Sequence, residues 1–165
     1  MRRTLSALLL AALLAPLAQG KEERRPIDLV ICLDTSGSME GLIDSARRKI
    51  WSIVNDLALA KPTPRLRVAL LSYGNDGHDA AAGWVRIHND FTEDLDAISQ
   101  TLFSFKTNGG TELVARVLQA SVDRLSWTPG SSHLKLIVVA GNESADQDKE
   151  VDLRKVCRAA IAKGI

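Results

Sequence analysis

The chain has few cysteines, with two among its 165 residues. Cys32 lies in an apolar run that predicts a strand and Cys157 lies in a late helical pattern, so a bridge between them would need a coincidence of geometry. Two cysteines are also too few to form a disulfide framework. We therefore expect both thiols to be reduced, or Cys157 to pair elsewhere.

A long apolar run is missing too, because the apolar stretch near the N-terminus is too short and too rich in small residues for a membrane span. Basic residues precede this stretch at residues 4–17, and Ala-Gln-Gly follows it at residues 18–20. The pattern is typical of a secretory signal peptide over residues 1–20, with a retained membrane anchor as the alternative. We expect cleavage after Gly20, no stable membrane span afterwards, and a periplasmic or secreted protein.

Neither sign of charge is in clear excess. The chain has 21 Lys and Arg residues, and removing Arg2 and Arg3 with the leader leaves 19 against 20 acidic residues. A near-neutral balance without a basic block provides no footprint for nucleic acid or for a charged membrane. The remaining length of about 145 residues is that of one domain with one core. We expect a charged tether at residues 21–26 and the domain over residues 27–165.

The segment from Ile27 to Met39 has the most informative pattern in the chain. A continuous apolar run rich in β-branched residues ends at Asp34 and enters a short polar turn. Such a run predicts a strand buried on both faces, and open α/β sheets keep their ligand sites at the carboxyl ends of strands. Asp34, Ser36 and Ser38 occupy alternate positions, so their oxygens can face one small space. This cluster suits a hard cation.

Other interpretations of this turn are weaker. Asp34-Thr35 resembles the catalytic turn of aspartic proteases, but Ser36 separates Thr35 from the glycine and no second such turn completes a dyad. The flanks of Gly37-Ser38 lack the spacing of a serine nucleophile elbow. A turn that merely caps a helix would be the favoured interpretation of an isolated motif, but the rest of the chain supplies a matching context.

That context is a resemblance to a known family. Asp34-x-Ser36-x-Ser38, between an apolar strand and an amphipathic helix, resembles the first element of the metal-ion-dependent adhesion site of von Willebrand factor type A (vWA) domains. Two further stretches are similar to that family in the same order, namely Thr107–Thr111 before a helix and the apolar strand Leu134–Ala140. The resemblance covers nearly everything after the leader.

The resemblance implies a doubly wound, Rossmann-like α/β fold, with a mostly parallel sheet flanked by helices and one antiparallel edge strand. Hydrophobic periodicity predicts elements in an order that fits this fold. The expected elements after the first strand are strands at Leu66–Tyr73, Trp84–His88 and Leu134–Ala140, and helices over residues 42–57, 92–102, 111–125 and 151–163.

Local signals refine these elements. Thr92 is expected to cap the helix that follows it. The basic residues 47–49 are expected to form a solvated face of the first helix. Residues 75–79 are rich in turn formers and predict a plain hairpin loop, because they lack the spacing and terminal Glu of a calcium-binding EF-hand loop.

The resemblance also implies a ligand set. It assigns a divalent cation, Mg²⁺ or alternatively Mn²⁺ or Ca²⁺, to Asp34, Ser36, Ser38 and Thr111, with a carboxylate from an unknown protein partner completing the shell. Thr111 stands at the expected start of a helix, so its hydroxyl has two possible roles there. It can bind the cation beside the Asp34 turn, or it can cap the helix.

The third family motif departs from the usual pattern. The strand usually ends in Thr-Asp-Gly, whereas this chain has Gly141 in place of the second acidic residue. Glu143 and Asp146 are candidates to substitute for the missing acid, but neither is at the matching position. Losing one carboxylate weakens retention of the metal and leaves a bound ion more electrophilic toward an arriving anion.

Three functional classes remain open. A metal-dependent protein-binding or adhesion module is favoured, a module of the same fold that binds without metal is the alternative, and a hydrolase has the least support. The sequence shows no paired carboxylates, Cys/His couple or histidine-rich metal cluster. His78, His88 and His133 are scattered, so we interpret them as ordinary surface or loop residues.

The last residues suggest a domain that continues. The final predicted helix ends at Gly164, as a helix C-cap does, and Ile165 stands where another buried strand would begin. Domains of the resembled family usually continue with two more strands and a closing helix. We therefore expect these elements to be missing here, and Leu134–Ala140 to form a long apolar edge.

Overall fold

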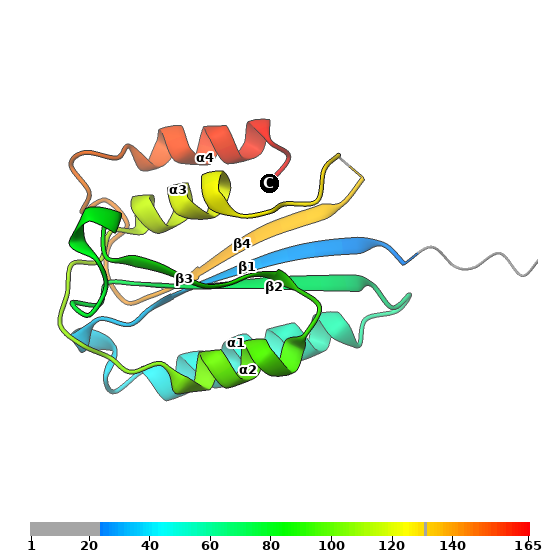
Figure 1. The fold of residues 1–165 in the computed structure, drawn as a ribbon, viewed down its shortest axis with the longest axis horizontal. Helices are drawn as coiled ribbons and strands as arrows, with labels where there is room; N and C mark the ends of the chain where they lie inside the picture. The colour runs from blue at the N-terminus through cyan, green and yellow to red at the C-terminus, as the bar shows by residue number, and fades with distance from the viewer. Residues whose placement is uncertain (1–23, 131) are drawn as a thin grey trace, which may run out of the picture.

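The computed structural model describes residues 24–130 and 132–165, so the predicted signal peptide lies outside the described residues. Four strands form one sheet in the order β3-β2-β1-β4, and helices cover both of its faces (Figure 1). The predicted doubly wound, mostly parallel α/β fold is confirmed. The elements are β1 (Pro26–Asp34), η1 (Gly37–Met39), α1 (Ile43–Ala58), β2 (Arg65–Tyr73), η2 (Ala80–Ala82), β3 (Val85–Thr92), α2 (Leu95–Ser104), α3 (Val114–Arg124), β4 (Leu134–Ala140) and α4 (Leu153–Ala162).

Strand β1 is the centre of the sheet. It pairs in parallel with β2 on one side and with β4 on the other, so that Ile31 lies between Leu70 and Val138. β3 runs antiparallel to β2 at one edge, as expected. Within the described residues, β4 forms the other edge. The carboxyl ends of the three parallel strands therefore meet at one side of the molecule, at the left in Figure 1.

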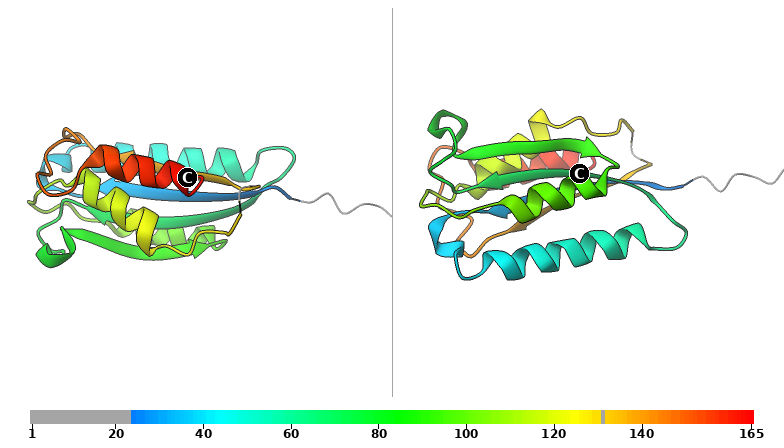
Figure 2. Two further views of the ribbon diagram at one scale, coloured as in Figure 1. Left: turned by 90° about the horizontal axis from the view of Figure 1, so that it is seen from above. Right: turned by 60° about the horizontal axis from the view of Figure 1, so that its bottom comes forward.

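The sheet separates two apolar clusters because side chains alternate between its faces. One cluster joins the central strands to α1 and α2 and includes Leu29, Ile31, Leu33, Val68, Leu70, Ile43, Ile50, Val54, Ile98 and Leu102. The other joins them to α3 and includes Val30, Cys32, Ala69, Leu71, Tyr73, Val114, Val117 and Ala120. α4 lies outside α3 and packs against it (Figures 1 and 2).

A buried ion pair lies near the end of the sheet where β1 and β2 begin. The carboxylate of Asp28 is fully buried in β1 and accepts two hydrogen bonds from Arg67 in β2, at 2.8 and 2.7 Å. It also accepts one from the backbone N–H of Thr128 at 2.7 Å. Burial raises the pKa of Asp28, but these donors outweigh burial and hold the pKa below its ordinary value. Removing one partner of such a pair costs roughly 3–5 kcal/mol.

Several local expectations need correction. The helix after Thr92 begins later, because Thr92 ends β3 and the side chain of Asp94 caps α2 by accepting from Ala97 N at 3.0 Å. β3 begins at Val85, since Trp84 has a positive φ of 54°, and it extends four residues beyond the expected end at His88. The last two helices begin later than predicted, at Val114 instead of residue 111 and at Leu153 instead of residue 151.

The polar and apolar faces of α1 differ from the expected pattern as well. Arg47 is not part of a solvated face. Its side chain is 11% exposed, and its guanidinium donates to the carbonyl oxygens of Phe103 and Phe105, at the end of α2. Leu42 and Ile53 belong to the apolar repeat of the sequence, yet they are 48% and 36% exposed. These two apolar side chains of the repeat therefore lie partly in solvent and are not buried against the sheet.

Both cysteines are free, with Cys32 buried in β1 and Cys157 exposed on α4, so the expected absence of a bridge between them agrees with the structure. Gly164 follows α4 with a φ of +74°, as expected of a helix C-cap. No helix among the described residues combines the length and the apolar character that a membrane span requires.

Candidate functional site

Three of the four predicted ligands meet where β1 ends. Asp34 is fully buried, and its Oδ1 accepts a hydrogen bond of 2.8 Å from the backbone N–H of Ser36. The hydroxyl of Ser36, the N-cap of η1, lies 3.0 Å from that of Ser38 within η1. The alternate spacing of these residues thus brings their oxygens together, as the sequence predicts.

The second carboxylate oxygen of Asp34 makes no hydrogen bond within the described residues. Asp34 Oδ2 is buried and has no hydrogen-bond partner among the described residues. A Cβ at Gly141 would lie 3.1 Å from Oδ2 and would collide with the hydroxyl of Tyr73, while a Cβ at Gly74 would lie 2.9 Å from Oδ1. Two glycines therefore keep side chains out of a cradle around one buried carboxylate.

The cradle has a negative potential. Burial is the main cause that raises the pKa of Asp34, hydrogen bonds from Ser36 oppose it, and the charges of Glu112 and Glu143 raise it further. Glu143, suggested by the sequence as a substitute for the missing acid, thus contributes its field here. Asp146 instead accepts a hydrogen bond from Ser144. A cation would relieve both the burial and the repulsion of these carboxylates.

Sequence reasoning missed two residues of this cradle. Glu112 carries one of the charges just described, and its Cγ would lie 3.1 Å from a Cβ at Gly74. Asn142 accepts a hydrogen bond of 3.1 Å from the hydroxyl of Ser38 through its amide oxygen. Its position directly after Gly141, at the end of the third family motif, was the available signal. Carboxylate, hydroxyl and amide oxygens are the donors that hard cations prefer, so the residues present fit such an ion.

Thr111 lies in the loop that approaches this cradle. α3 begins at Val114 with Leu113 at its N-cap and no side-chain cap, so the alternative that Thr111 caps the helix is wrong. The preceding backbone is tied to the Asp34 turn, because Asn108 N donates to Thr35 O at 3.1 Å. Thr111 itself is exposed, and no hydrogen bond joins it to the other three predicted ligands.

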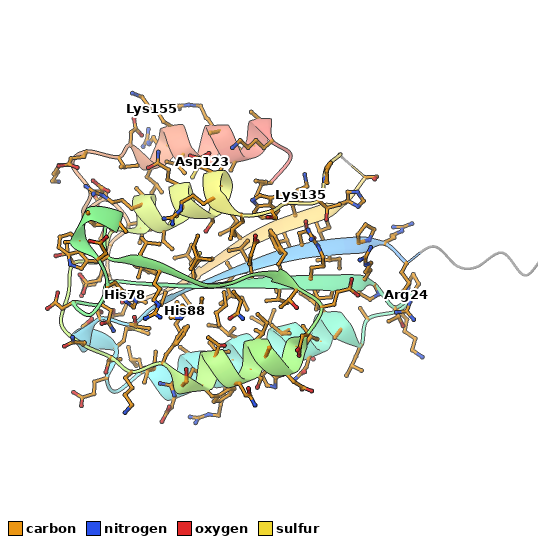
Figure 3. All side chains as sticks on the ribbon, viewed as in Figure 1. Arg24, His78, His88, Asp123, Lys135 and Lys155 are labelled. Carbon is orange, nitrogen blue, oxygen red and sulfur yellow. The ribbon has the colours of Figure 1, made fainter. Side chains whose placement is uncertain are left out.

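A second polar cluster lies at the end of β2 and corrects the interpretation of the histidines. The Nε2 atoms of His78 and His88 each lie 2.7 Å from the hydroxyl of Ser72, which is 1% exposed. Figure 3 shows both imidazoles at the carboxyl edge of the sheet. His78 lies in the loop after β2 and His133 in the loop before β4, as expected, whereas His88 lies within β3.

A β-bulge lies at His88, beside this cluster. In the pairing of β2 with β3, Leu71 lies opposite Ile87 and Leu70 lies opposite Asn89, so His88 is an additional residue on β3. Bulges re-aim side chains and are frequent beside functional sites. The sequence contains no signal for this shift of register.

The second cluster lacks the parts of a hydrolytic site. A serine nucleophile needs a base that a third group orients. His78 Nδ1 is buried without a partner, and within residues 24–130 and 132–165 no carboxylate bonds to either imidazole. Burial and the charge of Arg86 lower the pKa of His78 and lower that of His88 to about 4. Ser72 is therefore held by two neutral rings without an orienting acid.

Comparison with known families agrees with the fold and with the Asp34 motif. The model of the von Willebrand factor type A domain matches residues 28–165. The chain belongs to this family. The vWA fold explains why the Asp34 turn, the loop before α3 and the end of β4 converge. A comparison with curated protein sequences finds no match.

Solved structures show the same vWA fold. A von Willebrand factor type A protein from Catenulispora acidiphila has a TM-score of 0.62 and 18% identity, covering 84% of this chain and 32% of that one. Proximal thread matrix protein 1 of the mussel byssus has a TM-score of 0.63 and 11% identity, covering 86% and 36%. The pilus adhesin SpaC of Lactobacillus rhamnosus GG has a TM-score of 0.54 and 19% identity, covering 72% and 15%.

This vWA chain thus spans about a third or less of each of these three structures, from 15% to 36% of their length. At these identities the likeness establishes the fold.

Proposed function

We propose that this vWA domain binds a protein partner, without catalysis, through a divalent cation of the Mg²⁺ type. The observation that carries the proposal is Asp34 Oδ2, a carboxylate oxygen that is buried without a hydrogen-bond partner among the described residues. The hydroxyls of Ser36 and Ser38 belong to the same turn. A buried charge of this kind is costly unless a donor or a cation meets it.

The ligands in this proposal are Asp34, Ser36, Ser38 and Thr111. When bound, the cation supplies an open coordination position that a carboxylate of the partner fills. Glu112 and Glu143 lie close enough to act on the pKa of Asp34, so their charges also favour retention of a cation. They offset in part the acidic residue that Gly141 replaces. Mn²⁺ and Ca²⁺ are alternatives to Mg²⁺.

The proposal places the domain outside the cytoplasm, in the periplasm or secreted, after removal of a signal peptide. The N-terminal leader pattern in the sequence supports export, and the pilus adhesin among the similar structures fits an extracellular protein-binding role. The partner is a protein with an accessible acidic side chain. The near-neutral charge gives no reason to propose nucleic acid.

A vWA domain that binds its partner without metal is the second candidate. Gly141 favours it, because the missing carboxylate weakens the hold on any cation. The raised pKa of Asp34 is compatible with it too, since a neutral carboxyl group needs no counter-ion. A hydrolase has less support, because neither polar cluster contains an oriented nucleophile.

Selection from a phage-displayed random peptide library separates the two candidates. The immobilised protein is exposed to the library in Mg²⁺, and bound phage are eluted with EDTA. We expect the eluted peptides to be enriched in Asp or Glu, because a carboxylate completes the shell of the cation. They should fail to bind Asp34→Ala.

Asp56→Ala is the matched control, because Asp56 is an exposed acid of α1 with no ion pair or hydrogen bond within the described residues. It should bind the selected peptides as the wild type does. Peptides that stay bound in EDTA, or that bind Asp34→Ala equally well, would support the metal-independent candidate instead.

A further inference from the structure

The Ser72 cluster opens into a pocket on the α1 and α2 face of the sheet. Alternation along β2 puts Ser72 on the same face as Leu70, opposite to the face that Tyr73 shares with α3. The pocket has a volume of about 290 Å³. Its lining comes from the ends of β1 and β2, from β3 and from the segment after α2: Thr35, Ser72, Asn75, His78, Arg86, His88, Ser104, Phe105 and Lys106. We call it the histidine pocket.

The charge of the histidine pocket has one sign. Arg86 and Lys106 are its only permanently charged lining residues, and neither forms an ion pair within the part of the chain that the structure describes. No carboxylate lines the pocket. Arg86 is close enough to lower the pKa of both imidazoles. The pocket is thus lined by two cationic side chains and two imidazoles that can become cationic, and no lining residue carries a negative charge.

The hydrogen bonds of Ser72 show how this pocket can adapt. A hydroxyl has one proton and two acceptor positions. With neutral rings, Ser72 donates to one Nε2 and accepts from the other. With both rings protonated it can accept from both, which frees its own proton. Both nitrogens of His78 then carry protons, including Nδ1, which is buried and has no partner among the described residues. Protonation therefore turns the cluster into a set of donors.

We propose that the histidine pocket is a binding site for a small oxyanion, such as a phosphate or carboxylate group, held by Arg86, Lys106 and the two imidazoles. An anion would neutralise Arg86 and Lys106 and accept hydrogen bonds from protonated imidazoles. A transition metal is the competing ligand for two histidines, but the adjacent Arg86 and the absence of a lining carboxylate oppose a second positive charge. The β-bulge at His88 lies beside the pocket, and bulges are frequent beside functional sites.

The oxyanion site is separate from the proposed cation site. Asp34 faces the Tyr73 side of the sheet, whereas Ser72 faces the opposite side, and Thr35 lies between them as a wall of the histidine pocket. The two sites also bind ions of opposite charge. A test of one therefore does not depend on the other.

Titration of the histidine side chains by NMR tests the proposal directly. Long-range ¹H–¹⁵N spectra of the purified protein are recorded while inorganic phosphate is added at constant ionic strength. We expect the signals of His78 and His88 to shift and saturate, with their pKa values raised. His133 is an internal reference at the opposite edge of the sheet and should not move. Glutarate in place of phosphate shows whether a carboxylate serves equally well.

Variants locate the binding. Arg86→Gln should weaken phosphate about tenfold, which is the scale of one charge-assisted hydrogen bond, and Lys106→Gln should weaken it too. Both residues are exposed, so the fold should tolerate these changes. Lys49→Gln, which removes an exposed cation of α1, should have no effect. Parallel, unsaturable shifts of all three histidines, or equal losses in Lys49→Gln and Arg86→Gln, would overturn the proposal.

Discussion

The ends of the two neighbouring strands β1 and β2 carry polar clusters of opposite character. β1 ends in a carboxylate beside two hydroxyls, with Glu112 and Glu143 adding negative charge. The penultimate residue of β2 is a serine between two imidazoles, with Arg86 adding positive charge. Each cluster contains one buried atom without a partner, Asp34 Oδ2 in the first and His78 Nδ1 in the second. Each cluster therefore suits a ligand of the opposite sign.

The comparison shows how one sheet edge can hold two unlike sites. Parallel strands bring their carboxyl ends together, and the alternation of side chains then sends Asp34 to one face and Ser72 to the other. Thr35 is a shared wall, whose carbonyl accepts from Asn75 Nδ2 at 3.0 Å and from Asn108 N at 3.1 Å. Two adjacent residues, Asp34 and Thr35, therefore belong to two different proposed sites.

The largest expected effect that tests this difference comes from Asp34→Asn. It should abolish binding of divalent cations and at the same time stabilise the metal-free protein by about 1–3 kcal/mol, because it removes a buried charge without a counter-ion. Denaturant unfolding in EDTA measures the change, with Asp56→Asn as the exposed control. A variant less stable than the wild type in EDTA would mean that the charge of Asp34 is already compensated within the protein.

Gly141→Ala should break the cradle by filling it. The added Cβ collides with the Tyr73 hydroxyl and approaches Asp34 Oδ2, so we expect a loss of about 1–3 kcal/mol in stability and weaker cation binding. Adding Tyr73→Phe removes the colliding oxygen and should restore part of the stability. Thermal unfolding of the two single variants and the double variant measures this coupling. Additive losses would show that the close approach is not the cause.

The histidine cluster should make stability depend on pH in a defined direction. The pKa of His88 falls from 6.5 to about 4 on folding, so the unfolded state binds more protons between these values. Stability is therefore full above pH 6.5 and decreases as the pH falls toward 4, by about 1–2 kcal/mol for a partly exposed ring. Urea unfolding of the wild type and of His88→Gln isolates this part of the pH profile. Identical slopes in both proteins would contradict it.

Thr111→Val tests the smallest effect on the acidic side of the comparison. Thr111 is exposed and makes no hydrogen bond to Asp34, Ser36 or Ser38 in the structure, so its loss should leave stability within about 0.5 kcal/mol. If Thr111 is a ligand, cation affinity should fall severalfold. Calorimetric titration of the variant and of the wild type with the cation measures the change, since valine is nearly isosteric with threonine. An unchanged affinity would remove Thr111 from the ligand set.

The two clusters also differ in how well the sequence predicted them. Asp34, Ser36 and Ser38 follow one another within five residues, so local geometry after a buried strand was enough to bring them together. The arrangement of β1, β2 and β4 followed in the same way from continuous apolar runs.

The histidine cluster could not be predicted in this way. Ser72 and His88 are 16 residues apart, and their contact depends on the register in which β3 pairs with β2. Arg47 was misassigned for a similar reason, since its partners are backbone carbonyls at the end of a distant helix. Contacts that depend on strand register or helix packing leave little trace in local sequence patterns.

Isothermal titration of the purified protein with Mg²⁺, Mn²⁺ and Ca²⁺ tests the central claim most directly, because it needs no knowledge of the partner. We predict saturable binding of at least one of these ions to a single site, which is lost in Asp34→Asn and retained in Asp56→Asn and Arg86→Gln. Absence of binding for all three ions, or equal binding by Asp34→Asn, would contradict the claim that the carboxylate at the end of β1 holds a cation.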